Sequence, residues 1–145
     1  MYLILRIVIG SIFVGAGIGK ILGPYQNFLY VIQAYQLLPS WGEVLTAQIF
    51  PWAELIIGTF VLLGLWTAWG LRGALVLFSV FVVVVGQALI RGISLENCGC
   101  FGGLIHFKPQ TVIIMDSAGV LLTSFLLFKL PQARKFSLDS YFDKA

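Results

Sequence analysis

Charged side chains are scarce in this sequence. Aspartate, glutamate, lysine and arginine make up 10% of the 145 residues, whereas apolar residues make up 59%. A soluble domain carries about 25% charged residues, because its water-facing surface has to be covered. The composition therefore excludes an ordinary soluble domain and indicates a protein that lies in lipid. The net charge of +3 is small and no basic–aromatic run accompanies it, so we expect no nucleic-acid partner.

Cysteine and histidine are rarer still, with two and one in the whole chain. A closed zinc or copper site needs about four ligands, and Cys98, Cys100 and His106 supply only three. The sequence therefore favours a protein without a metal centre. A metal ion held by these three residues stays as an alternative.

Long apolar blocks dominate the rest of the chain. Four of them are near the length of about 20 residues that a membrane-spanning helix needs, and they occupy residues 2–22, 44–66, 71–90 and 111–130. Their apolar residues are continuous rather than alternating, which favours helices over a barrel. We predict an all-α integral membrane protein: a four-helix transmembrane domain at residues 1–131, followed by a polar cytoplasmic tail at 132–145.

A short amphipathic helix is expected between the first two spans, bracketed by Pro24 and Pro39. One helical face of this segment carries Tyr25, Phe28, Leu29, Ile32 and Tyr35. With Trp41 just beyond it, the segment has the aromatic pattern of a helix lying at the membrane interface. A connecting helix packed over the bundle is the alternative.

Lysine and arginine are unevenly divided between the two ends of the predicted bundle. The end with both termini receives Arg6, Arg72, Lys129, Arg134, Lys135 and Lys144, and the other end receives Lys20, Arg91 and Lys108. Because cytoplasmic loops carry the excess of positive charge, we expect both termini in the cytoplasm of a bacterium and the protein in its inner membrane. The loop with both cysteines then faces the periplasm, where disulfides form and persist.

The two cysteines stand one residue apart in the stretch LENCGCFGG. A disulfide needs Cα atoms about 4.4–6.8 Å apart, which Cys98 and Cys100 can meet only if the backbone bends, as Gly99 permits. So short a ring stores strain and is more oxidising, whereas a structural disulfide gains more by closing a long loop. The spacing favours a redox-active pair, with Phe101 and Gly102 as supporting loop residues. Two free cysteines close by chance are the alternative.

Polar and ionisable residues inside the spans form a second candidate site. A charge in hydrocarbon costs about 3 kcal/mol or more, so such a residue is usually paired or functional. The candidates are Lys20, Glu54, Gln87, Arg91 and Asp116. We expect them to form a buried polar group beneath the cysteine loop.

Two helical stripes support this placement on the inner faces of the helices. The first stripe is Arg6, Gly10, Gly17 and Lys20, and the second is Asp116, Gly119 and Thr123. Small residues let helices approach closely, so both stripes are expected to face the bundle axis. A purely structural alternative is that Lys20–Glu54 or Arg91–Asp116 are ion pairs that fix the register of the helices.

Several of these residues together resemble the DoxX superfamily, and within it the MauE branch. The resemblance is carried by Lys20, by AYQLLP at 34–39, by PWAELIIG with Pro51, Glu54 and Gly58, and by CGCFG at 98–102; it extends over residues 7–127. It implies a small four-helix inner-membrane protein. MauE implies a thioredoxin-like partner in the maturation of a disulfide-rich periplasmic enzyme subunit, and other relatives imply quinone-coupled sulfur oxidation.

From the cysteine spacing and this resemblance we predict a membrane thiol–disulfide oxidoreductase. The cysteine pair would exchange with a periplasmic thioredoxin-like partner and pass electrons to a quinone. Trp41, Trp52 and Phe101 are the candidate quinone contacts, and a residue of the buried polar group would move a proton or polarise a quinone carbonyl. Two alternatives stay open: a non-catalytic subunit or assembly factor that docks a redox partner, and a carrier of small solutes or metal ions.

Overall fold

The computed structural model describes residues 2–93 and 108–133. They form four long helices, α1 (Tyr2–Leu22), α3 (Ser40–Leu63), α4 (Thr67–Ile90) and α5 (Pro109–Phe128), and two shorter ones, α2 (Tyr25–Tyr35) and α6 (Leu130–Ala133). No strand occurs within these described ranges. The all-helical class expected from the continuous apolar runs is confirmed, and α2 is the helix expected between the first two spans.

The four long helices are the membrane spans. Each is long and apolar enough to cross a bilayer, with a mean hydropathy between 1.5 for α3 and 2.5 for α4. Many of their large apolar side chains point outward, including Ile90, Val83 and Leu121. An apolar exterior of this kind suits lipid rather than water, so the chain is a membrane protein with several spans.

The first span has the expected ends and the third ends at residue 90 as expected, whereas the other ends differ from the expected ones by two to four residues. The second span begins directly after Pro39, at Ser40 instead of residue 44, and it ends at Leu63 instead of residue 66. Gly64 stops it in a left-handed conformation with φ of 69°, which glycine adopts without steric cost. The third span then begins at Thr67 instead of residue 71. Hydropathy does not detect these ends, because the capping geometry sets them.

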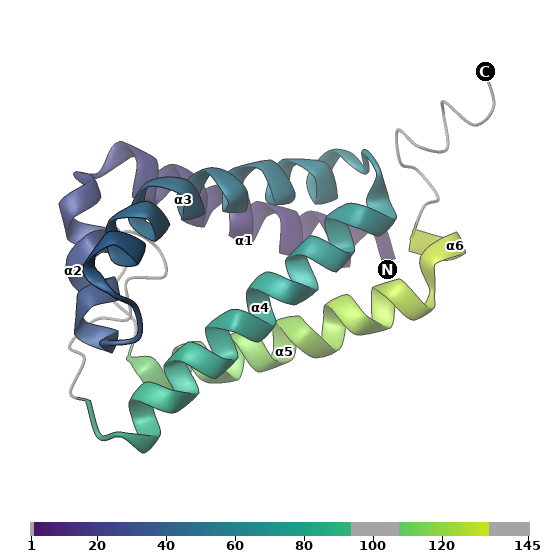
Figure 1. Cartoon of the computed structure of the whole chain (residues 1–145). Helices are drawn as coiled ribbons and strands as arrows, with labels where there is room; N and C mark the ends of the chain where they lie inside the picture. The colour runs from purple at the N-terminus through teal and green to yellow at the C-terminus, as the bar shows by residue number, and fades with distance from the viewer. Residues whose placement is uncertain (1, 94–107, 134–145) are drawn as a thin grey trace.

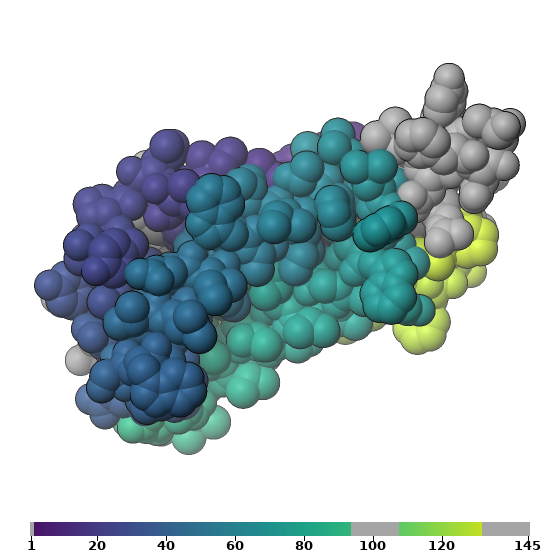
Figure 2. Space-filling model, turned by 45° about the horizontal axis from the view of Figure 1, so that its top comes forward, coloured from purple at the N-terminus to yellow at the C-terminus, as the bar shows by residue number. Residues whose placement is uncertain are grey.

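The spans are arranged as two pairs. Helix α1 packs along α3 and α4 packs along α5 (Figure 1). Helices α3 and α4 lie close at the turn that joins them and diverge toward the opposite end, where α2 fills the space between them (Figure 1). We call this opposite end the α2 end. Figure 2 shows α2 and the start of α3 at the surface of the α2 end, and α6 at the opposite end of the molecule.

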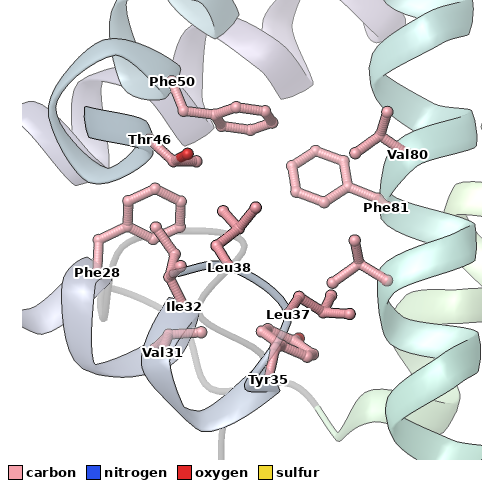
Figure 3. A pocket seen from close by; sticks show the side chains of 11 residues that line it. Phe28, Val31, Ile32, Tyr35, Leu37, Leu38, Thr46, Phe50, Val80 and Phe81 are labelled. Atoms are coloured by element: carbon pink, nitrogen blue, oxygen red, sulfur yellow. The ribbon is translucent and has the colours of Figure 1, made fainter. Parts of the chain in front are cut away.

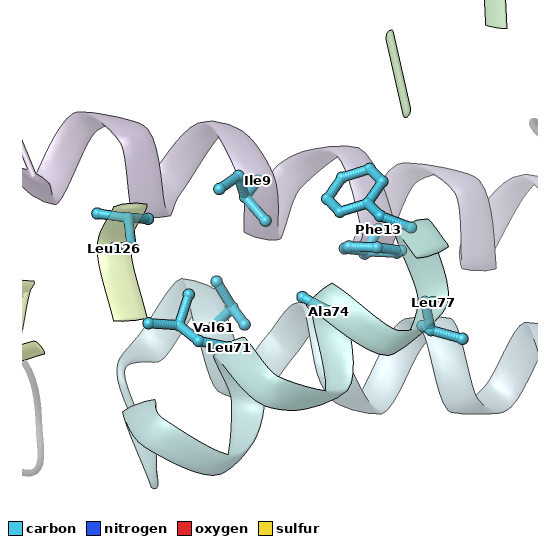
Figure 4. Close-up of a cluster of buried hydrophobic side chains, with 8 residues drawn as sticks. Ile9, Phe13, Val61, Leu71, Ala74, Leu77 and Leu126 are labelled. Atoms are coloured by element: carbon cyan, nitrogen blue, oxygen red, sulfur yellow. The ribbon is translucent and has the colours of Figure 1, made fainter. Parts of the chain in front are cut away.

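The larger apolar core lies where the two helix pairs meet. Ile9 and Phe13 of α1 contact Val61 of α3 and a row of α4 side chains, and α5 adds Leu126 (Figure 4). The rings of Phe13 and Phe78 lie 4.7 Å apart between centroids. This core holds the pairs together away from the α2 end, where they diverge.

Glycines bring α1 and α3 into close contact. A Cβ atom added at Gly58 would lie 2.7 Å from the backbone nitrogen of Val14, and one at Gly10 would lie 2.8 Å from that of Leu62. A Cβ at Gly17 would lie 2.9 Å from the carbonyl oxygen of Pro51. Both predicted stripes are buried, as expected, and the first fixes α1 against α3.

Replacing Gly58 with alanine should therefore force the two helices apart. We expect a loss of about 1–3 kcal/mol in the free energy of unfolding, as for other overpacked sites. Gly15→Ala is the matched control, since a Cβ at Gly15 on the same helix pair meets no atom within 4 Å. Unfolding by sodium dodecyl sulfate in mixed micelles measures both variants; equal stabilities for the two would contradict this packing.

Candidate functional site

A buried ion pair joins α1 to α3 near the α2 end. Lys20 Nζ lies 2.7 Å from both Oε1 and Oε2 of Glu54. The two side chains are 0% and 1% exposed, so water does not weaken their attraction. The pair is positioned by the close approach of the two helices at Gly17 and Pro51. Lys20 follows Gly17 by three residues and Glu54 follows Pro51 by three, so both side chains lie one helical turn beyond this contact. This is one of the two ion pairs that the sequence suggested.

Three phenylalanine rings surround the lysine ammonium. Nζ of Lys20 lies 4.8 Å from the ring centroid of Phe28, 5.8 Å from that of Phe50 and 5.4 Å from that of Phe81. These distances fall in the range of cation–π attraction. The rings come from α2, α3 and α4, so the charge of α1 is held by three other helices. We call these three rings the phenylalanine cage.

The remaining members of the predicted polar group are only partly brought together. Asp116 of α5 is 8% exposed, and its buried Oδ2 has no hydrogen-bond partner among the described residues. Gln87 of α4 is half-buried. Asp116 and Lys20 both occupy inner faces, but Asp116 does not share in the Lys20–Glu54 salt bridge.

The alternative pair of Arg91 and Asp116 is not formed. Arg91 follows the last residue of α4 and is exposed, and its guanidinium donates a hydrogen bond of 3.2 Å to the backbone carbonyl of Tyr35. Of the two ion pairs that the sequence suggested, this one does not form, because α2 offers the Tyr35 carbonyl at the point where α4 ends. Arg91 thus ties α4 to α2 instead of balancing the aspartate.

An apolar cavity of about 230 Å³ lies at the α2 end between α2, the turn after it, α3 and α4. All three rings of the phenylalanine cage also line this cavity, so they separate it from the ion pair. Figure 3 shows these rings directed into one space. The other lining side chains are Val31, Ile32, Tyr35, Leu37, Leu38, Thr46, Val80 and Val84.

The cage and the cavity were not predicted from the sequence. One signal was available: Phe50 precedes Glu54 by four residues, which places both on one face of α3. Phe28 was predicted to share one helical face of the segment between the first two spans, without a contact to any charge. What the sequence lacks is the angle between α3 and α4, which creates the space that α2 covers.

The two tryptophans proposed as quinone contacts lie elsewhere. Trp41 is 75% exposed and Trp52 is 55% exposed, and neither lines the cavity. Both side chains point outward: Trp41 lies in the first turn of α3, as expected of an aromatic residue near a membrane interface, whereas Trp52 lies near the middle of that helix. Their role as quinone contacts stays a prediction.

The predicted cysteine site, including Cys98, Cys100 and the supporting residues between 99 and 102, lies outside the described residues. So does His106, and with it the metal alternative. Within the described ranges, no group of three or more metal-binding side chains comes together.

The described residues on either side of that segment lie at the α2 end. Ile93 packs against the apolar cluster formed by Tyr35, Val85 and Val112, which joins α2, α4 and α5. On the other side, α5 begins at Pro109. The chain therefore leaves and re-enters the described structure at the end that carries the ion pair and the cavity.

Fold and site together define a multi-span helical membrane protein with a buried lysine–glutamate pair beside an aromatic-lined cavity. The chain belongs to the MauE family, described as methylamine utilisation protein MauE, which matches residues 1–129. This confirms the MauE part of the resemblance. The wider DoxX placement stays a prediction.

Two curated relatives are similar to the chain. Methylamine utilization protein MauE of Methylorubrum extorquens is 30% identical over 109 residues, covering 74% of this chain and 59% of the relative. Protein TlpB of Flavobacterium psychrophilum is 27% identical over 135 residues, covering 87% of this chain and 36% of TlpB. The matched part thus spans about three fifths and one third of these relatives. No solved structure matches the chain.

Proposed function

We propose that this protein is a membrane thiol–disulfide oxidoreductase of the bacterial inner membrane. Cys98 and Cys100 would exchange a disulfide with a periplasmic thioredoxin-like protein, and the electrons would pass to a membrane quinone. The supporting observation is the position of Ile93 and Pro109, because the cysteine-bearing segment joins the bundle at the end where the buried charge and the cavity lie. Membership of the MauE family agrees with this role.

The distribution of positive charge gives the proposed orientation of the protein in the membrane. Six of the nine lysines and arginines fall at the end that carries both termini in the sequence, which favours the cytoplasm for that end. The α2 end then faces the periplasm, an oxidising compartment in which a thiol pair can cycle. A periplasmic thioredoxin-like protein meets the cysteine pair on this side.

The proposed reaction consists of two balanced steps. In the first, a partner thiolate attacks the Cys98–Cys100 disulfide through a mixed disulfide, leaving the partner oxidised and both cysteines reduced. In the second, the dithiol loses two electrons and two protons as its S–S bond forms again. The quinone gains both and becomes the quinol. One cysteine pair serves both steps, because the chain has no second pair.

Quinone reduction by the purified protein tests the proposal. The full chain in lipid nanodiscs is mixed with a reduced thioredoxin and ubiquinone-1, and the quinone absorbance is followed over time. We expect a decrease that requires both the thioredoxin and the protein. If thioredoxin binds without any change in absorbance above the protein-free rate, the proposal is wrong and the protein is a docking subunit.

A further inference from the structure

The cavity at the α2 end has the character of a ligand site for a small ring. Its walls are almost entirely side chains of phenylalanine, leucine, isoleucine and valine, with Thr46 and Tyr35 as the polar exceptions. An apolar protein cavity of about 150 Å³ holds one benzene molecule. The cavity here, at about 230 Å³, has room for a substituted six-membered ring.

The rim of the cavity faces the region that lipid occupies. Leu37 and Leu38, in the turn between α2 and α3, are each 42% exposed, and Val80 of α4 is 41% exposed. These side chains line the cavity and also reach the outer surface. A ring inside could therefore keep an attached apolar chain in the bilayer.

The inner wall of the cavity is thin and lies against a positive charge. Phe28, Phe50 and Phe81 line the cavity on one side and hold Lys20 Nζ within 5.8 Å of their centroids on the other. Phe50 packs edge-on against Phe81 at 5.5 Å, and Phe28 is 6.2 Å from Phe50. A ligand in the cavity is thus one ring away from the ammonium.

The ammonium keeps its positive end toward the cavity. The two oxygens of Glu54 accept from Lys20 at 2.7 Å, and the three rings of the cage lie within 5.8 Å of Nζ. Because the Lys20 side chain is 0% exposed and does not line the cavity, its charge acts on a ligand through the rings and not by direct contact.

We propose that this cavity binds the headgroup of a membrane quinone, with the ammonium end of the Lys20–Glu54 pair on the far side of the phenylalanine cage. A quinone combines a flat apolar ring with an apolar tail, which match the walls and the rim. The ammonium behind the rings also favours the negative charge that develops as the quinone is reduced, because Coulomb attraction is strong in a dry interior. The inference rests on the proposed function for the source of the electrons, whereas binding itself is independent of the cysteines.

Photolabelling tests the site directly. The full chain in lipid nanodiscs is illuminated with an azido analogue of ubiquinone, and the labelled peptides are identified by mass spectrometry. We expect saturable labelling on α2, α4 and the start of α3, and competition by ubiquinone-1. Labelling that does not saturate, or that spreads evenly over the lipid-facing helices, would overturn the inference. Equal competition by palmitate would overturn it as well, because the cavity would then be an acyl-chain site.

A cavity-filling variant adds a matched pair. Val84→Trp places an indole in the cavity and should weaken competition by ubiquinone-1 by about tenfold or more, because the ring and the indole compete for one volume. Val76→Trp makes the same substitution at a residue of α4 that is 62% exposed, and it should leave the competition by ubiquinone-1 unchanged. Val80→Phe fills less of the cavity and serves if Val84→Trp does not fold. Unchanged labelling in the filled variants would reject the site.

The same samples separate this inference from the proposed function. Stoichiometric disulfide exchange with thioredoxin, measured without quinone, should be normal in Val84→Trp. Exchange without saturable labelling would reject the quinone site and leave the thiol chemistry standing. Saturable labelling of a protein that does not exchange with thioredoxin would reject the thiol chemistry and leave the site standing.

Discussion

Replacing Lys20 with methionine is expected to lower the free energy of unfolding by about 3–5 kcal/mol, because Glu54 would be left as an unpaired charge in a dry interior. Both side chains are almost completely buried, and the rings around the ammonium cannot stabilise an anion in its place. Methionine keeps nearly the length of the lysine chain, so the loss reports on charge rather than on volume.

The double variant Lys20→Met/Glu54→Leu is the decisive control. Replacing both partners of a buried pair with apolar residues is often neutral or stabilising. We therefore expect the double variant to recover most of the lost stability when unfolding is measured in mixed micelles. If Lys20→Met lowers the free energy of unfolding by less than about 1 kcal/mol, the value of a surface pair, the Lys20–Glu54 pair is not shielded from water as its burial indicates.

The second large effect is expected at the cysteines. Cys98→Ser and Cys100→Ser should each reduce thioredoxin-dependent quinone reduction by about a thousandfold or more, as the removal of a covalent nucleophile does. The variant that keeps the cysteine attacked by the partner should also form a mixed disulfide with a thioredoxin that lacks its second cysteine and carries thionitrobenzoate on its first. The remaining thiolate displaces thionitrobenzoate, which leaves with the electron pair, and no second thiol resolves the new disulfide. Nonreducing gels detect this adduct.

Ser94→Ala is the matched control for the cysteine variants, since it changes a hydroxyl in the same segment and keeps both thiols. It should retain the turnover of the unmodified protein. Full turnover in either cysteine variant would exclude thiol chemistry at this pair and favour the docking subunit.

Much of the fold follows from the sequence because lipid imposes simple rules. Continuous apolar runs near 20 residues leave only helices as a solution, and the alternation of small and polar residues identifies their inner faces. The stripe that ends in Lys20 and the one that begins at Asp116 are both buried. The ends of α3 were harder to predict from the sequence, because the local backbone geometry at Pro39 and Gly64 sets them.

The site was predictable in part for a related reason. Lys20 and Glu54 are costly in hydrocarbon, so a pairing between them was among the few ways to bury both. Arg91 and Asp116 invited the same argument, but Arg91 lies past the end of α4 and finds a carbonyl of α2. The pairing of charges can be reasoned from cost, whereas the position of a helix end relative to a neighbouring helix cannot.

The phenylalanine cage depends on tertiary arrangement alone. Phe28, Phe50 and Phe81 come from three helices, and each would serve equally well as an ordinary apolar residue of a span. They meet around Lys20 because α3 and α4 diverge and α2 closes the space (Figures 1 and 3). No periodicity in the sequence encodes that angle.

Cys98 and Cys100 should form a redox pair that exchanges with a thioredoxin-like protein, and the oxidation state of their thiols is the sharpest test of this exchange. Nanodiscs with oxidised protein are mixed with reduced thioredoxin and quenched with an alkylating reagent, and the intact mass is measured. We expect no alkylation of the protein before mixing and two alkyl groups per chain afterwards. Two cysteines whose alkylation is the same before and after reduced thioredoxin is added would contradict it.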